Sequence, residues 1–322
     1  MKRILVVGAG GQIGTELVPH LQKLYGTDNV ISADMKDEMV TKMAAFGPSE
    51  KLDATDGAAF AALVRKHRVD SIFNLVALLS ATGEKNPQLA WNINMGALLN
   101  SLNIAKEEGC SVFTPSSIGA FGASTPHDMT PQDTVMRPNT IYGCCKVAGE
   151  LLSDYYFTRF GVDTRSVRFP GIISNGALPG GGTTDYAVEV FYEIIKPGHR
   201  YTCEIPHDSY MDMMYMPDAL KAVTDLMEAD PARLKHRNSF NIASMSFSPE
   251  VLFEAIRKRI PDATFDYAVD PVKAAIADSW PNMMDDSCAR SEWGWNPVWD
   301  MESVIDDMLA AVRKKEKDAA GV

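Results

Sequence analysis

Short apolar runs alternate with longer helical patterns through the first half of the chain. Five of these runs are rich in β-branched residues and end at Gly, Asp, Asn or Pro, as buried strands do; they cover residues 3–7, 30–33, 71–75, 111–115 and 164–169. Between them, apolar positions recur with helical spacing over residues 12–24, 57–67, 87–107 and 141–160. This alternation predicts an α/β fold with a doubly wound parallel sheet, which binds ligands outside the carboxyl ends of its strands.

The pattern changes after residue 171. A glycine-rich segment over 178–184 predicts a flexible loop, and a helical pattern resumes over about 185–196. Strands are expected at 213–216 and 264–269, and helices at 217–228, 249–260 and 301–315. We therefore expect a first domain over residues 1–170, rejoined by about 209–245, and a smaller, discontinuous C-terminal lobe over 171–322 that binds the substrate.

The composition is that of a globular protein with a sizeable core, because 46% of its 322 residues are hydrophobic and 23% are charged. A formal net charge of -11 repels phosphate backbones, so nucleic acid is not expected as a partner. The 5 cysteines are odd in number without a Cys-x-x-Cys pair, and the 6 histidines lack metal-ligand spacing. Neither a disulfide framework nor a bound metal is therefore expected.

No apolar stretch approaches the roughly 18 residues that a membrane span needs, so no membrane association is expected. The apolar run after Met1 stops at Gly8, which is too short for a signal-peptide core and fits a strand. The expected location is the cytoplasm, with the mitochondrial matrix as the alternative if a targeting peptide was removed.

Three glycines, Gly8, Gly11 and Gly14, follow the first predicted strand and open the first predicted helix. The first permits a tight turn, the second lets the backbone approach a pyrophosphate, and the third allows close packing of helix and strand. Asp34 ends the second strand about 20 residues later, where its carboxylate can accept the ribose hydroxyls of NAD and repel the 2′-phosphate of NADP. We predict a Rossmann domain that binds NAD rather than an ordinary glycine turn, with Lys36 near enough to weaken the preference over NADP.

Asp53 follows a candidate third strand. Two roles stay open for its carboxylate, which can accept the adenine amino group or cap the helix predicted from residue 57.

Tyr142 and Lys146 stand at positions i and i+4 of one predicted helix, so their side chains are neighbours on one face. We expect the lysine ammonium and a cationic nicotinamide to lower the tyrosine pKa from about 10 toward working pH, which makes the phenol a general base. Ser117 stands just past the strand ending at Pro115, where its hydroxyl can bind the substrate oxygen. A surface pair and a turn serine are the alternatives. The glycine loop makes catalysis the favoured interpretation.

These motifs resemble those of the extended short-chain dehydrogenases and reductases, the superfamily that includes UDP-galactose 4-epimerase. Further segments resemble its L-threonine 3-dehydrogenase branch; they are residues 115–122, 168–174, 178–186, 213–218, 277–281 and 285–287. Gly119 departs from the epimerases, which commonly carry threonine at that position. The resemblance implies oxidation of L-threonine by NAD to 2-amino-3-oxobutyrate and NADH, as a step of threonine catabolism.

The resemblance also implies roles for individual residues. Tyr142 would take the hydroxyl proton, Ser117 would steady the oxygen, and Lys146 would hold the nicotinamide ribose. Further cofactor contacts are expected from Gln12, Ile13, Ala54, Leu75, Ala77, Asn94, Phe169 and Ile172, and substrate contacts from Ser80, Thr183, Thr184, Asp185 and Trp280.

Some of these positions have structural alternatives. Thr183, Thr184 and Asp185 can instead cap the helix that follows them. Trp280 can be a packing residue. Gly180 to Gly182 are expected to let their loop move as a lid. Helices 87–107 and 141–160 would pair into a homodimer, as relatives of this fold usually do.

Two rival functions share part of the pattern. A nucleotide-sugar epimerase or dehydratase has the same fold and the Tyr-Lys pair but retains its NAD. A non-catalytic NAD-sensing protein needs the cofactor site alone, so the presence of Ser117, Tyr142 and Lys146 argues against it.

Overall fold

The computed structural model describes residues 1–176, 180 and 182–320. Its centre is a parallel sheet of six strands in the order β3-β2-β1-β4-β5-β7. The strands are β1 (Ile4–Val7), β2 (Val30–Asp34), β3 (Ser49–Lys51), β4 (Ser71–Asn74), β5 (Ser111–Phe113) and β7 (Thr164–Arg165). The chain leaves β1 toward β2 and later returns to β4 on its other side, so the order reverses there and the predicted doubly wound sheet is confirmed.

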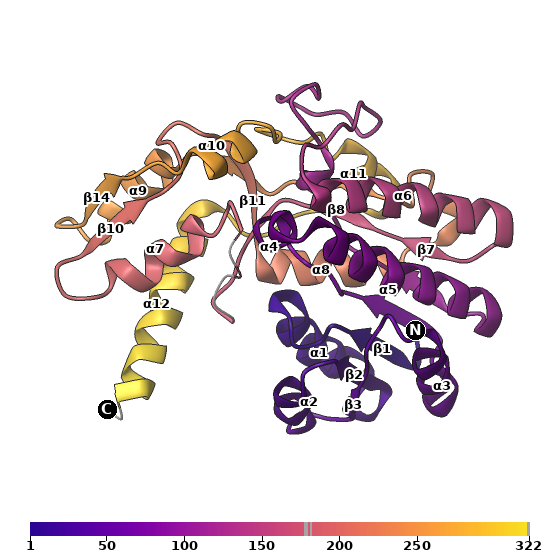
Figure 1. Cartoon of the computed structure of the whole chain (residues 1–322). Helices are drawn as coiled ribbons and strands as arrows, with labels where there is room; N and C mark the ends of the chain where they lie inside the picture. Colours follow the sequence, from indigo (N-terminus) through magenta and orange to yellow (C-terminus); the bar gives the residue numbers. More distant parts are fainter. Residues whose placement is uncertain (177–179, 181, 321–322) are drawn as a thin grey trace.

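Helices cover both faces of this sheet (Figure 1). Ile4 and Val6 pack on the face of α1 (Gln12–Tyr25) and α8 (Met216–Glu228). Leu5 and Val7 point to the opposite face, as neighbours along a strand do. That face is covered by α3 (Gly57–His67), α5 (Pro87–Glu108) and α6 (Ile141–Phe160). These helices agree with the predicted ranges within one residue at each end.

The predicted strand over 164–169 is wrong as a single element. The structure divides it into β7 and β8 (Val167–Phe169), because the Ser166 N–H leaves the large sheet and donates to Arg237 O at 3.0 Å. β8 then lies between β6 (Ser116–Ser117) and β12 (Phe240–Asn241) in a second sheet. This places the end of β6 beside the end of β8.

The second half contains two further small sheets. One has the order β13-β11-β9, and the other pairs β10 with β14. Their strands are β9 (Gly171–Ile173), β10 (Arg200–Cys203), β11 (Met211–Tyr215), β13 (Met245–Phe247) and β14 (Thr264–Tyr267). The methionines of β11 are buried, which confirms the predicted core strand.

The remaining helices are mostly in the second half. They are α2 (Asp37–Ala44), α4 (Ser80–Lys85), α7 (Tyr186–Ile194), α9 (Pro249–Arg257), α10 (Pro271–Ala277), α11 (Ser287–Trp293) and α12 (Met301–Ala320), with short 3-10 turns at Thr27–Asn29, Ile118–Ala120 and Pro231–Arg233. In Figure 1, α7, α9, α10, β10 and β14 lie together at the left, apart from the six-stranded sheet. α7, α9 and α12 share one hydrophobic core with β10 and β11. Among the described residues, no helix combines the length and the apolar character needed to cross a membrane.

A short segment after β9 is held from two sides. Glu16, in the first turns of α1, accepts a hydrogen bond from the Ser174 hydroxyl, which itself accepts the Gly176 N–H. Lys315, near the end of α12, donates to Asn175 O. The segment 174–176 therefore contacts both the first helix and the last helix of the chain.

Candidate active site

The glycine turn after β1 has the geometry that its sequence predicts. Gly8 has a φ of +76°, in the region that favours glycine, and its N–H donates to Ala33 O at 2.9 Å. A Cβ on Gly14 would lie 2.6 Å from Ala9 O, so only glycine lets α1 pack this closely. The N-cap of α1 is Gly11, which supplies no side-chain acceptor. This helix start therefore presents backbone donors to an anion.

A cavity of about 570 Å³ opens beside this turn, at the carboxyl ends of β1, β2 and β4. Asp34 lies in its wall, where its two oxygens accept the N–H groups of Gly10 at 2.9 Å and Lys36 at 3.0 Å. These bonds fix the carboxylate while leaving lone pairs for a ligand. The volume suits a nucleotide-sized molecule. Other predicted cofactor positions in the wall are Gly8, Gly11, Asp53, Ala54, Leu75 and Ala77.

Asp53 does not cap α3. The Asp56 carboxylate occupies that position and accepts the Ala59 N–H. Asp53 instead accepts two hydrogen bonds from Thr55, which hold the pKa of its carboxyl below the ordinary value. The helix-cap interpretation of Asp53 is therefore wrong, and its predicted contact with adenine stays a prediction.

A second cavity of about 170 Å³ shares Leu75 and Ala77 with the first. The predicted catalytic residues Ser117, Tyr142 and Lys146 all lie in its wall. Besides the shared Leu75 and Ala77, nine other predicted positions line it; they are Gln12, Ile13, Ser80, Phe169, Ile172, Thr183, Thr184, Asp185 and Trp280. Residues predicted from motifs far apart in the chain thus converge on one space.

Lys146 is fixed beside Tyr142. Its Nζ lies 5.2 Å from the centroid of the tyrosine ring and donates to Pro115 O at 2.7 Å. The Ser117 Oγ accepts the Gly119 N–H at 3.1 Å. A Cβ on Gly119 would lie 3.2 Å from the Tyr142 ring, so the glycine leaves room for the phenol.

The start of α6 positions the tyrosine. Thr140 caps this helix by accepting the Gly143 N–H at 3.0 Å, and the Ile141 N–H donates to Glu84 at 2.8 Å. Tyr142 and Lys146 then face the cavity from successive turns.

Glu150 continues the same face of α6 and is a residue that the motif search missed. It forms a buried ion pair with Arg168 of β8, with Nη2 to Oε2 at 2.8 Å and Nε to Oε1 at 3.0 Å. The Ser116 hydroxyl also donates to Glu150 Oε1, at 2.5 Å. Hydrogen bonds of Glu150 therefore connect α6 with β6 and β8 directly beside Ser117. The i, i+4, i+8 spacing of Tyr142, Lys146 and Glu150 was the available signal.

Asn94 lies outside the walls of both cavities. Its side-chain amide holds the loop after β4, accepting the Leu78 N–H at 2.7 Å and donating to Leu78 O at 3.2 Å. Its predicted cofactor contact stays a prediction.

The predicted substrate loop is described in part, because residues 177–179 and 181 lie outside the described residues. Gly181, in the predicted lid, is among them. Thr183 is buried, and the Asp185 carboxylate accepts the Gly182 N–H at 2.6 Å from the N-cap position of α7. Trp280 packs in the core of the second half and also lines the cavity, and its predicted closing of the pocket stays a prediction.

Asp212 anchors the segment that follows Trp280. It is fully buried in β11, and its Oδ2 accepts the Met284 N–H at 2.6 Å. Its Oδ1 has no hydrogen-bond partner among the described residues. Burial raises the pKa of this carboxyl from the ordinary value of 3.8 to about 8, against a smaller lowering by the Met284 bond.

We expect Asp212→Asn to flatten the pH dependence of stability. Between pH values of about 4 and about 8 the folded protein keeps a proton on Asp212 that the unfolded chain releases, so the free energy of unfolding falls as pH rises through this window. An amide cannot release that proton. Urea unfolding of both proteins across the window measures the two slopes, and equal slopes would contradict the assignment.

Comparison with known proteins gives consistent results. The model of the NAD dependent epimerase/dehydratase family matches residues 4–243. A Staphylococcus aureus relative described as an uncharacterized epimerase/dehydratase is 53% identical over 98% of each chain. Among solved structures, L-threonine dehydrogenase from Clostridium difficile is 52% identical, with a TM-score of 0.96 over 98% of each chain. The L-threonine dehydrogenase from Phytophthora infestans is 46% identical, with a TM-score of 0.93 over 98% of this chain and 100% of that one.

Proposed function

This chain belongs to the NAD dependent epimerase/dehydratase family, and from that premise we infer that it is an NAD-dependent oxidoreductase that acts on L-threonine. It oxidises the side-chain hydroxyl, giving 2-amino-3-oxobutyrate and NADH. The observation that carries this function is the small cavity that brings Ser117, Tyr142 and Lys146 together with Gln12 and Ile13 at the start of α1. Its volume of about 170 Å³ suits a small amino acid.

The residues around the larger cavity fit NAD. The turn at Gly8, the free N-terminus of α1 and the Asp34 carboxylate provide a site for a pyrophosphate and a ribose diol. When bound, NAD supplies the acceptor for the hydride that leaves the threonine Cβ. The protein's own residues bind and orient both molecules and handle the proton.

Tyr142 is the proposed general base. Its phenolate oxygen takes the proton from the threonine hydroxyl while the Ser117 hydroxyl donates a hydrogen bond to the same substrate oxygen. Lys146, held by Pro115 O, places its ammonium beside the phenol and favours the ionised form. All three act from one wall of the cavity.

Other polar residues of the same cavity wall recognise the two charged groups of the amino acid. Hydroxyls of Ser80, Thr183 and Thr184, with backbone N–H groups at the start of α7, suit the carboxylate. Asp185 supplies a negative charge for the ammonium. We propose that Thr183, Thr184 and Asp185 belong to a lobe over residues 171–322. This lobe completes the site over a Rossmann domain of 1–170 and about 209–245, which contributes Ser80.

We expect Asp34→Ala to raise the ratio of kcat/KM for NADP over NAD by at least about tenfold, since a like charge beside the 2′-phosphate is removed. Steady-state kinetics with each cofactor measures the ratio. Asp37→Ala is the matched control, because Asp37 is exposed and lies outside the cavity wall. An unchanged ratio in Asp34→Ala would reject the ribose role.

An assay with NAD and L-threonine, followed by NADH absorbance, tests the function. NADH formation that depends on L-threonine supports it. Conversion of a UDP-sugar without NADH release would instead identify an epimerase, and cofactor binding without turnover of either substrate would identify a sensor.

The outer faces of α5 and α6 support the proposal of a homodimer. Large apolar side chains are exposed on these two helices; they are Trp91, Leu99, Leu151, Tyr155, Phe157 and Phe160. Pairing of the two helices with those of a second copy would cover this surface. Light scattering gives the mass in solution, and a monomer at assay concentration would reject the dimer.

A further inference from the structure

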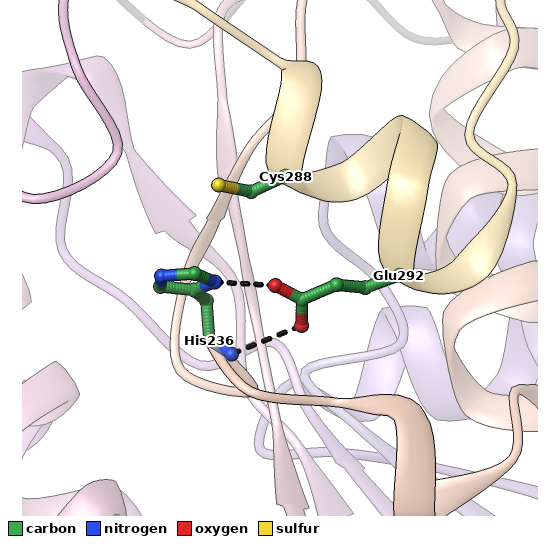
Figure 2. Close-up of side chains that lie close together, drawn as sticks. All are labelled: His236, Cys288 and Glu292. Atoms are coloured by element: carbon green, nitrogen blue, oxygen red, sulfur yellow. Dashed lines mark hydrogen bonds and ion pairs between the residues drawn. The ribbon is translucent and has the colours of Figure 1, made fainter.

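Three side chains of metal-binding type meet outside both cavities. His236 comes from the segment before β12, while Cys288 and Glu292 stand at i and i+4 on α11 (Figure 2). One donor atom from each lies within 4.8 Å of the others. The His236 Nδ1 and the Glu292 Oε1 are 2.5 Å apart. The two helix positions share one face, and the histidine approaches them from the facing segment.

The surrounding groups orient the potential ligands. The Glu292 Oε2 accepts the backbone N–H groups of Lys235 at 2.5 Å and His236 at 3.1 Å, which aims Oε1 at the imidazole. On the far side of the ring, His236 Nε2 lies 3.5 Å from the Asp133 carboxylate. A histidine with a carboxylate on its second nitrogen is the usual arrangement of a metal ligand, because the carboxylate fixes the tautomer and strengthens the donor.

The charge of this cluster favours a cation. The carboxylates of Glu292, Asp285 and Asp133 surround the Cys288 side chain with negative charge. A bound divalent ion would displace the thiol proton and compensate the surrounding negative charge.

We propose that His236, Cys288 and Glu292 bind one Zn²⁺ ion, with water as the fourth ligand. Imidazole, thiolate and carboxylate together suit zinc better than magnesium or calcium, which prefer oxygen ligands alone. Zinc–ligand bonds of about 2.0–2.3 Å place tetrahedral ligand atoms about 3.3–3.7 Å apart. The ion therefore replaces the hydrogen bond between His236 and Glu292, and these two donors separate by about 1 Å to admit it.

Titration of reduced, tag-free protein with Co²⁺ tests the site, because a cobalt–thiolate bond gives a charge-transfer band. One equivalent of Co²⁺ should produce this band, and one equivalent of Zn²⁺ should remove it. Cys288→Ser should abolish the band, whereas Cys144→Ser, which removes an exposed cysteine elsewhere, should retain it. Asp133→Asn should weaken Zn²⁺ binding about tenfold, because it removes the carboxylate that orients His236 and its negative charge.

Protection of the thiol gives a second readout. Zn²⁺ should slow alkylation of Cys288, located by peptide mass analysis, and should not slow alkylation of Cys144. The proposal is overturned if no cobalt–thiolate band forms in the unaltered protein. It is also overturned if the band persists in Cys288→Ser, or if Zn²⁺ leaves the alkylation rate of Cys288 unchanged. Circular dichroism of Cys288→Ser confirms that a lost band does not reflect unfolding.

Discussion

Replacing Tyr142 with phenylalanine is expected to lower kcat for L-threonine oxidation by about 10³-fold while NAD affinity is retained. The substitution removes one oxygen, the proposed proton acceptor, and leaves the ring that Gly119 accommodates. The wall around Asp34, on the far side of Leu75 and Ala77, is untouched. Steady-state kinetics and titration of NAD binding separate the two effects.

Tyr210→Phe is the matched control for this experiment. Tyr210 is exposed and lies outside both cavities, so the same loss of a hydroxyl should leave kcat unchanged. If Tyr142→Phe turned over threonine at a rate comparable to Tyr210→Phe, another group would have to be the base.

Glu150→Ala is expected to lower the free energy of unfolding by about 3–5 kcal/mol, because it leaves the Arg168 guanidinium buried without its counter-charge. The change also removes the acceptor of the Ser116 hydroxyl. Denaturant unfolding at neutral pH measures the loss. We thus expect the ion pair to stabilise the packing of α6 against β6 and β8, next to Ser117.

Two further variants test whether the loss of unfolding free energy in Glu150→Ala comes from the unpaired buried charge. The double variant Glu150→Leu with Arg168→Met removes both charges and should recover much of the stability, since apolar replacement of a buried pair is often nearly neutral. Glu254→Ala breaks an exposed pair with Arg257 and should cost only about 0.5 kcal/mol. A loss in Glu150→Ala no greater than that of Glu254→Ala would refute the role of the buried pair.

The helices were predictable because their ends carry local signals. The range 141–160 matches α6 because Thr140 caps its start and Gly161 ends it with a φ of +72°. The strand 164–169 was mispredicted because its break depends on Arg237 O, a partner far along the chain. The spacing of apolar residues along the chain does not indicate such a long-range partner.

The site shows the same division. Ser117, Tyr142 and the glycine turn were found because each follows a strand end or has a short motif, and parallel strands bring such ends together. Arg168 was unassigned because a buried charge within a strand is recognisable only beside its partner. Metal-ligand spacing in the sequence likewise did not indicate His236 and Cys288. The two residues become neighbours only because α11 packs beside the segment before β12.

The contact of Glu16 with Ser174 has a consequence for the coupling between the two binding sites. Glu16 belongs to α1, whose start forms the proposed pyrophosphate site. Ser174 precedes the predicted substrate loop that contains Thr183 and Thr184. A shift in either element therefore reaches the other through one hydrogen bond. By thermodynamic reciprocity, the factor by which bound NAD changes the affinity for the amino acid equals the factor by which the bound amino acid changes the affinity for NAD.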